Sequence, residues 1–359
     1  MAAFASAAAG AGDVFLGNPA WGAAERAQLD ELAAAATADA DDQSGWLMIP
    51  TGGTSGRLKL ARHDSRTLSA AVSGFTGHFG LQKVNAVGGL PLHHVSGLLG
   101  WLRCALTGGL YLPADWKEIE QGLRPALREL ADGWVISLVP TQLHRLLRDA
   151  AVTDWLRQFR LVLLGGAPAW PDLLDRAAAA KINLAPSYGM TETAAMVTAL
   201  RPDEFLAGAR SAGSPLPRVR VAVDGNGLIT VAAESNFLGY YPERRPVAQA
   251  LATADLGRID ERGHLHVLGR RDQAIITGGE KVQPAEVEAV LKAATGVGEL
   301  AVIGLADAEW GERVVCVTAA GAGFSMALAQ RAADQHLLPH ERPKAYVMLA
   351  IWPATEAGK

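Results

Sequence analysis

Short runs of apolar residues alternate along the chain with longer segments in which apolar residues recur every three or four positions. The short runs predict strands at 45–50, 85–92, 110–113, 134–139, 160–166 and 181–185. The periodic segments predict helices at 65–79, 97–109, 141–149 and 172–181, with Asp64 as the N-cap of the first. Buried strands that alternate with helices are typical of an α/β fold with a largely parallel sheet.

The pattern changes after residue 210. Alternating runs around Asp224-Gly225 and Asn226-Gly227 predict a hairpin within 218–235, and 257–272 repeats that style. Beyond Asp272, helices are expected at 284–295 and 327–337, and strands at 299–305 and 313–320. We therefore expect a large domain (1–271) with mostly parallel sheets plus a β-rich section, followed by a small α+β domain (272–359).

Composition narrows the classes of function. The chain has 359 residues, 49% of them hydrophobic, and this length and apolar content suffice for two domains. Its formal net charge is −4. No basic excess or polybasic run favours nucleic acid or a membrane surface. Cys104 and Cys316 lie far apart in apolar segments, which favours a reduced protein without disulfides. Because the first fifteen residues lack a basic region and are interrupted by Gly10, Gly12 and Asp13, we expect neither a signal peptide nor a membrane span, and a cytoplasmic protein.

A loop rich in glycine and hydroxyl groups follows the strand at 45–50. Its glycines allow sharp backbone turns that point N–H groups at one spot, and its hydroxyls and Lys59 add further donors for an anion. These residues are Thr51, Gly52, Gly53, Thr54, Ser55 and Gly56. The pattern lacks the Gly-Lys-Ser/Thr ending of the common nucleotide-hydrolase loop, and Gly/Ser/Thr clusters are usually plain surface turns. Taken alone, the loop leaves phosphate binding and a surface turn equally open.

A second unusual stretch, "PSYGMTETAAM" (186–196), brings Tyr188, Thr191 and Glu192 into a Gly-containing loop. An aromatic ring can stack on a purine, and a carboxylate beside a hydroxyl can hold Mg²⁺ against phosphate oxygens. "GGAP" (165–168) follows another strand and could lie along an adenine edge, and Asp255 could accept ribose hydroxyls. Each piece alone is compatible with an ordinary loop.

The order of these pieces resembles that of a known family. "TGGTSG…K", "PLHHVSG", "GGAP", "SYGMTE", "TADLGRID", "GRRDQAIITGGEKVQPAEVE" and "PATEAGK" follow one another from Thr51 to Lys359. The set closely resembles the adenylate-forming superfamily of acyl- and aryl-CoA synthetases, from about residue 46 to the last residue. The two most specific stretches are 187–193 and 269–291.

The resemblance implies roles for individual residues toward ATP and Mg²⁺. The loop from Thr51 to Gly56 and Lys59 would grip the β- and γ-phosphates. Tyr188 would stack on adenine beside Gly166 and Ala167. The α-phosphate would contact Thr191, within the stretch Gly189-Met190-Thr191, and Glu192 would bind Mg²⁺. Asp255, supported by Arg270, would accept the ribose hydroxyls.

The resemblance also implies how the small domain works. It would rotate about a hinge at Asp272, and Lys359 would bridge the carboxylate and the α-phosphate during adenylation. Gly278, Gly279, Glu280 and Lys281 would line the pantetheine tunnel of CoA in the rotated state. Family members usually have a longer segment before the glycine loop and continue beyond this lysine. In addition, Gly52 stands where serine is usual and Leu58 where proline is usual, so a truncated or weakly active enzyme is one expectation.

The acid is expected to contact the segment at 90–102, "LPLHHVSGLLGWL". This segment mixes His and Ser with Leu and Gly, which suits a compact aromatic acid with polar groups better than a fatty acid. Together with "SAGSPLPRVRV" (211–221), it is most similar to the o-succinylbenzoate–CoA ligases of menaquinone and phylloquinone synthesis. His94, Ser96, Gly97 and Ser187 are the candidate substrate contacts.

Three readings of the function stay open on these grounds. The first is an ATP-dependent acid–CoA ligase that acts on a small carboxylic acid and CoA. The second is an adenylation enzyme that loads a carrier protein, because both use a phosphopantetheine thiol. The third is a non-catalytic nucleotide-binding module. The sequence leaves a homo-oligomer open as well.

Overall fold

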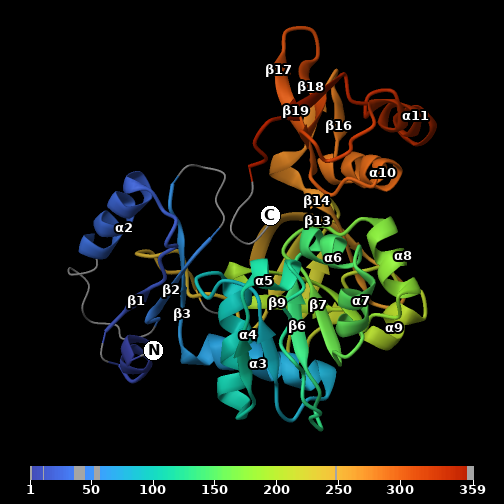
Figure 1. Ribbon diagram of the computed structural model, residues 1–359. Helices are drawn as coiled ribbons and strands as arrows, with labels where there is room; N and C mark the ends of the chain where they lie inside the picture. The colour runs from blue at the N-terminus through green and yellow to red at the C-terminus, as the bar shows by residue number, and fades with distance from the viewer. Residues whose placement is uncertain (1, 11, 36–44, 52–56, 247–248, 354–359) are drawn as a thin grey trace.

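The computed structural model describes residues 2–10, 12–35, 45–51, 57–246 and 249–353. A large unit contains the central sheet and its covering helices, and a smaller unit formed by the C-terminal residues lies at the top of Figure 1. The fold is mixed α/β, with a large N-terminal part and a smaller C-terminal part, as the sequence predicts.

A seven-stranded sheet in the order β10-β9-β8-β7-β6-β4-β5 forms the centre of the large unit. The five strands from β5 to β8 in this order are parallel, whereas β9 and β10 pair antiparallel at one edge. The strands are β4 (Ala86–Gly88), β5 (Tyr111–Pro113), β6 (Val135–Leu138), β7 (Leu161–Leu164), β8 (Leu184–Met190), β9 (Ala195–Ala199) and β10 (Ser214–Pro215). The expectation of a largely parallel sheet is confirmed.

Alternate residues of these strands face two different cores. Val162 and Leu164 pack with side chains of α6 to α8, whereas Leu161 and Leu163 pack with Phe75 of α3 on the other face. Because both faces are covered, the strands read as continuous apolar runs. The helices are α3 (Ser65–Phe79), α4 (Val95–Thr107), α5 (Trp116–Glu120), α6 (Pro140–Leu146), α7 (Ala150–Leu156), α8 (Pro171–Ala179) and α9 (Pro202–Leu206).

Helix α3 begins where the sequence predicts. The Asp64 side chain accepts a hydrogen bond from the Thr67 N–H at 2.7 Å, and the Thr67 hydroxyl oxygen accepts one from the Asp64 N–H. This reciprocal capping satisfies two backbone donors at the first turn. At the other end Gly80 adopts the left-handed conformation that commonly stops a helix.

Two smaller sheets complete the large unit. The first contains β1 (Val14–Phe15), β2 (Leu47–Pro50) and β3 (Leu60–His63), beside α1 (Ala2–Ala8) and α2 (Ala23–Ala35). The second is an antiparallel meander of β11 (Arg220–Val223), β12 (Leu228–Ala232), β13 (Leu251–Ile259) and β14 (Leu265–Arg270). The turn between β11 and β12 lies at Asp224–Gly227, so the predicted hairpin is confirmed.

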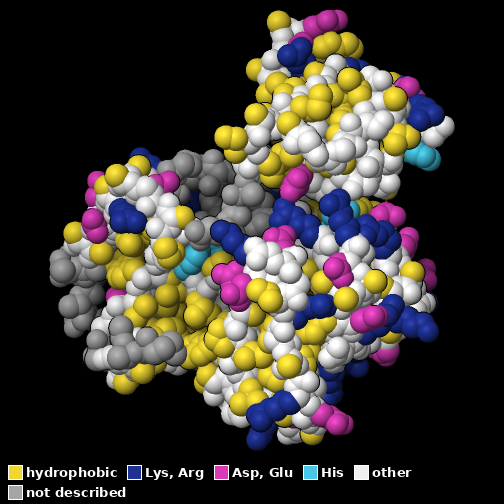
Figure 2. Space-filling model, viewed as in Figure 1, with side chains coloured by type: hydrophobic (Ala, Val, Ile, Leu, Met, Phe, Trp, Pro, Cys, Tyr) yellow, Lys and Arg dark blue, Asp and Glu magenta, His cyan; other side chains and the backbone are white. Residues whose placement is uncertain are grey.

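The C-terminal unit has a sheet and a core of its own. Its elements are η3 (Arg271–Gln273), β15 (Ile275–Thr277), β16 (Glu280–Val282), α10 (Pro284–Thr295), β17 (Leu300–Asp307), β18 (Gly311–Ala319), α11 (Met326–His336) and β19 (Ala345–Leu349). Val287 and Leu291 of α10 and Ala329 and Ala333 of α11 are buried against the strands. In Figure 2, Lys and Arg side chains gather where the large unit faces this smaller unit. Within the described ranges, no helix is both long and apolar enough to span a bilayer.

Candidate active site

The candidate site lies where the central sheet, the small N-terminal sheet and the meander meet. Gly165-Gly166-Ala167 follow the carboxyl end of β7, and Ser187 lies beside them in β8. The Ser187 hydroxyl donates to the Leu164 carbonyl at 3.1 Å, so it is engaged within the sheet. This edge of an open α/β sheet is where ligands usually bind.

Four predicted residues form a connected chain of polar contacts. Tyr188 is buried, with 9% of the residue exposed. Its hydroxyl donates to Asp255 Oδ2 at 2.6 Å. Arg270 Nη1 lies 3.5 Å from Asp255 Oδ1, and its Nε and Nη2 donate to the Asp272 carboxylate at 2.8 and 2.7 Å. The structure thus brings together four predicted residues from the central sheet and the meander. They are the predicted adenine-stacking Tyr188, the ribose-binding Asp255, its supporting Arg270, and the hinge residue Asp272. Burial, followed by the Asp255 charge, raises the pKa of Tyr188, so its hydroxyl remains a donor.

The stretch at 186–196 differs from the expected loop. Residues up to Met190 belong to β8, a single 3-10 turn η2 (Thr191–Thr193) follows, and β9 returns antiparallel. The pairing with β9 extends the strand, because Gly189 lets the two backbones approach. A side chain at Gly189 would place its Cβ 2.0 Å from the Ala195 carbonyl oxygen. Ala194 and Ala195 have φ of 50° and 77°, which costs energy in a non-glycine residue and is common at functional sites.

His63 at the end of β3 supports this turn and was missed by the sequence reasoning. Its Nε2 lies 2.9 Å from the Thr191 carbonyl oxygen and its Nδ1 lies 3.1 Å from the Thr67 hydroxyl. Burial lowers the pKa of His63 to about 4, so the ring is neutral at neutral pH. A buried neutral imidazole therefore fixes the position of Thr191 from behind.

Glu192 and Lys59 both contact Tyr240, which sequence reasoning also missed. The Tyr240 hydroxyl donates to Glu192 Oε1 at 2.5 Å, and the Lys59 ammonium lies 5.4 Å from the centroid of the Tyr240 ring. No hydrogen bond or ion pair among the described residues engages Glu192 Oε2. In the sequence, Gly239-Tyr240 follows the apolar pair Phe237-Leu238, which is compatible with a turn. Nothing in this stretch indicates that Tyr240 lies near Glu192.

The chemistry of Glu192 fits Mg²⁺. This ion is usually held by one or two carboxylates together with substrate phosphates and water, rather than by a cage of protein ligands. Within the described ranges, no group of three or more His, Cys, Asp and Glu side chains could hold a metal. A single half-buried carboxylate with one open oxygen therefore matches Mg²⁺ delivered with a nucleotide.

Several predicted residues lie outside the described ranges, namely Gly52, Gly53, Thr54, Ser55, Gly56 and Lys359. The two ends of the glycine loop are described. The Thr51 N–H donates to the Lys59 carbonyl at 2.9 Å, which brings the ends together beside β2 and β3. The end of the loop at Lys59 thus lies beside Tyr240.

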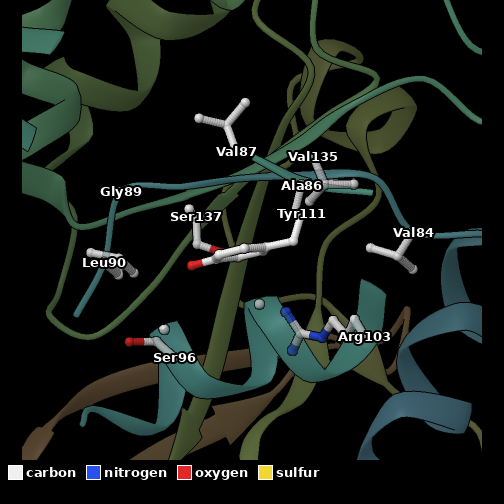
Figure 3. A pocket seen from close by; sticks show the side chains of 13 residues that line it. Val84, Ala86, Val87, Gly89, Leu90, Ser96, Arg103, Tyr111, Val135 and Ser137 are labelled. Carbon is white, nitrogen blue, oxygen red and sulfur yellow. The ribbon is translucent and has the colours of Figure 1, made fainter. Parts of the chain in front are cut away.

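The predicted substrate segment borders a small cavity of about 20 Å³ (Figure 3). Ser96 and Gly97 line it, together with Ser137 and Tyr111, whereas His94 is the N-cap residue of α4.

Arg103, which the sequence reasoning missed, also lines this cavity and is only 3% exposed. Its Nε makes no hydrogen bond, and within the described part of the chain no carboxylate forms an ion pair with it. The guanidinium lies 4.1 Å from the centroid of the Phe75 ring, and burial lowers its pKa to about 10, so it stays charged.

The predicted pantetheine residues lie at the start of the C-terminal unit. Gly278 and Gly279 form the turn between β15 and β16, and the Gly278 N–H donates to the Trp310 carbonyl at 2.8 Å. Glu280 and Lys281 belong to β16 and are exposed.

Comparison with protein families agrees with this geometry. The model described as AMP-binding enzyme matches residues 6–241, and that described as AMP-binding enzyme C-terminal domain matches residues 286–359. The chain belongs to the AMP-binding enzyme family. Its membership accounts for the order of the motifs and for the proximity of Tyr188, Asp255, Arg270 and Asp272.

Among curated relatives of this AMP-binding enzyme are two 2-succinylbenzoate–CoA ligases. The protein from Enterococcus faecalis is 30% identical, over 86% of this chain and 66% of its own length. The protein from Listeria innocua is 32% identical, over 86% of this chain and 67% of its own length. The chain thus spans about two thirds of the length of these relatives.

Solved structures of the family are similar as well. The o-succinylbenzoate CoA synthetase of Bacillus subtilis, in complex with an acyl-adenylate intermediate, has a TM-score of 0.74 and 25% identity, covering 88% of this chain and 68% of its own. The ATP-bound protein MatB of Rhodopseudomonas palustris has a TM-score of 0.72 and 28% identity, covering 88% and 66%. The similarity extends over both units of the fold.

Proposed function

We propose that this AMP-binding enzyme is an ATP-dependent acid–CoA ligase that converts 2-succinylbenzoate, ATP and CoA into 2-succinylbenzoyl-CoA, AMP and pyrophosphate. The family match, the relatives named above and the convergence of Tyr188, Asp255, Arg270 and Glu192 support the ligase class. The observation that carries the choice of acid is Arg103, a buried cation without a carboxylate partner in the described structure, beside the predicted substrate segment.

The reaction has two steps that share one set of residues. A carboxylate oxygen of the acid attacks the α-phosphorus of ATP, and the bond to pyrophosphate breaks. The sulfur of CoA then attacks the acyl carbon, the bond to AMP breaks, and the thiol proton is released. Both steps develop charge on phosphate oxygens, so positioned cations and N–H donors supply most of the rate.

We assign the nucleotide to the polar chain described above. Tyr188 would stack on adenine next to Gly166 and Ala167, Asp255 and Arg270 would hold the ribose, and Thr191 would contact the α-phosphate. Lys59 and the loop at 51–56 would hold the outer phosphates. Glu192 would hold Mg²⁺, which when bound neutralises charge on the phosphate oxygens. Lys359 would approach the reacting carboxylate.

The C-terminal unit would supply the second half-reaction. We propose domain bounds of 1–271 and 272–359, a hinge at Asp272, and a pantetheine contact for Gly278 to Lys281. The reaction is assigned to the cytoplasm, where ATP and CoA are available.

The acid is assigned through charge. A buried guanidinium without a counter-charge is costly, and a carboxylate that reaches it offsets that cost through charge-assisted hydrogen bonds. The proposed acid carries a second carboxylate besides the reacting one. Because the cavity beside Arg103 holds little more than one water, Tyr111 would have to move to admit that carboxylate.

CoA-dependent AMP release across a panel of acids tests the assignment. We expect 2-succinylbenzoate to exceed benzoate, 4-hydroxycinnamate and octanoate by at least roughly tenfold, the effect of one well-made polar contact. Arg103→Met should raise KM for 2-succinylbenzoate at least about tenfold. It should leave unaffected whichever of 2-butanoylbenzoate and 4-oxo-4-phenylbutanoate is a substrate, since each keeps the ketone but has only one carboxylate. An equal loss for both acids would show that Arg103 only supports the fold through Phe75.

The same assay separates the other readings. Thioester formation on a carrier protein in preference to CoA would favour the carrier-loading enzyme. An absence of ATP–pyrophosphate exchange with every acid would favour a non-catalytic binding module.

A further inference from the structure

The segment around Tyr240 joins two motifs that are far apart in the sequence. Leu238 donates its N–H to the Arg62 carbonyl at 2.8 Å, and Tyr241 donates to the Leu60 carbonyl at 2.9 Å, so the segment runs along β3. At its start, the Phe237 N–H donates to the Glu192 carbonyl at 2.8 Å. The backbone therefore fixes Tyr240 relative to both Lys59 and Glu192.

The chain accommodates this crossing with a glycine. Gly239 has a φ of 131°, and a Cβ there would lie 2.7 Å from the Glu243 carbonyl oxygen. Such a conformation is nearly restricted to glycine. The turn after Gly239 directs Tyr240 toward the site and leaves Tyr241 in the core with Phe15, at a ring centroid distance of 5.1 Å.

The Tyr240 side chain contacts both charged residues at once. Its hydroxyl donates to Glu192 Oε1 at 2.5 Å, and its ring lies 5.4 Å from the Lys59 ammonium. Burial, followed by the Glu192 charge, raises the pKa of Tyr240, so the hydroxyl stays a donor under all ordinary assay conditions. Phe237 packs edge-on against the Tyr240 ring at 4.9 Å and limits its rotation.

We propose that Tyr240 is a positioning residue that holds the Glu192 carboxylate through Oε1 and keeps Lys59 from pairing with it, so that both charges are available to a metal–nucleotide complex. This inference rests on the proposed function, because it takes Glu192 as the metal ligand and Lys59 as a phosphate contact. It assigns to Tyr240 neither substrate contact nor chemistry.

Two variants separate the two parts of this role. Tyr240→Phe keeps the ring beside the Lys59 ammonium but removes the hydrogen bond to Glu192. Tyr240→Ala also removes the ring, and on this proposal the Lys59 ammonium then pairs with the Glu192 carboxylate, which neutralises both charges. Tyr241→Phe is the matched control, since it removes the hydroxyl of the adjacent tyrosine, which makes no hydrogen bond in the described structure.

Binding of a fluorescent ATP analogue, titrated with and without Mg²⁺, tests the proposal without relying on turnover. Tyr240→Phe should raise the Mg²⁺ concentration at half-saturation about tenfold, the typical effect of losing one charge-assisted hydrogen bond, and leave metal-free binding unchanged. Tyr240→Ala should weaken metal-free binding as well, because Lys59 is then engaged by Glu192. In a Glu192→Gln background, Tyr240→Phe should have no further effect.

Three results would overturn the proposal: unchanged Mg²⁺ dependence in Tyr240→Phe, an effect of equal size in the Glu192→Gln background, or the same shift in Tyr241→Phe. Thermal melts of each variant identify a loss that reflects folding alone, and Tyr240→Phe preserves the packing if Tyr240→Ala does not fold. Wild-type protein that fails to bind the analogue even with Mg²⁺ would instead remove the proposed function, and this inference with it.

Discussion

His63 shows how a single buried residue links the site to stability. The ring is fully buried between Thr67 and Thr191, and burial lowers its pKa to about 4, whereas an unfolded histidine titrates near about 6.5. Between these values the unfolded chain binds more protons than the folded one. The stabilisation is therefore complete above pH 6.5 and is lost as the pH falls toward 4. From pH 7 to pH 5 the loss should be about 2 kcal/mol.

Urea unfolding at pH 7 and pH 5 tests this prediction. His63→Gln should lose about 2 kcal/mol less than the wild type between these pH values, although it is less stable at pH 7. His144, whose pKa is also lowered to about 4 by burial and by Arg148, keeps part of the dependence in the variant. His336→Gln, at an exposed position of α11, is the control and should retain the wild-type slope. An unchanged slope in His63→Gln would refute the role of His63.

The sequence singles out individual candidate residues only where they belong to a contiguous motif. Tyr188, Glu192 and Asp255 stand in short stretches whose composition indicates nucleotide chemistry. His63, Arg103 and Tyr240 do not, because their roles depend on tertiary proximity to residues far along the chain. Arg103 in particular stands in an ordinary helical pattern, and only its burial without a carboxylate partner in the described structure distinguishes it.

At the scale of elements, the 3-10 turn η3 connects the two units and carries the proposed hinge. Asp272 in this turn accepts two hydrogen bonds from Arg270, but both side chains are roughly half exposed, so the pair contributes little stability. We expect Asp272→Pro to impair thioester formation far more than adenylate formation. The proline ring fixes φ, and a hinge residue must change its backbone angles between the half-reactions.

Asp272→Ala is the matched control, because it removes the same carboxylate but leaves φ free. Rapid-quench measurements of the two half-reactions should show a selective loss of the second step in Asp272→Pro and a similar, small change of both steps in Asp272→Ala. If the two variants behave alike, the carboxylate matters rather than the backbone, and Asp272 is not the hinge.

Elements were predictable where packing repeats a simple period. The parallel strands and their helices follow from apolar runs and caps, and both predicted hairpins of the meander form. The stretch at 186–196 was predicted as a loop because its glycine and hydroxyl residues are typical of turns. In the structure the antiparallel pairing of β8 with β9 extends the strand through Met190, an effect of tertiary contact that local composition does not report.

At the scale of the whole molecule, polar contacts of Arg145 and Lys292 join the C-terminal unit to the large one, beside apolar packing of Ala289. Arg145 of α6 lies 2.9 Å from Glu120 in the large unit and 2.5 Å from Glu299 in the C-terminal unit. The Lys292 ammonium of α10 lies 5.4 Å from the centroid of the Trp170 ring, at the start of α8. A partly exposed ion pair of this kind contributes about 0–1 kcal/mol, so the loss of the Arg145–Glu299 pair should shift the arrangement only modestly.

We therefore expect Glu299→Gln to lower the population of this arrangement by up to roughly fivefold, the equivalent of about 1 kcal/mol. Fluorescence energy transfer between one exposed engineered cysteine in each unit would measure this change, because Cys104 and Cys316 are buried and remain unlabelled. Glu120→Gln removes the other partner of the same arginine, within the large unit, and should leave the distribution unchanged. Equal effects of both variants would mean that Arg145 acts by supporting α6, and that the contact between the units does not depend on its bond to Glu299.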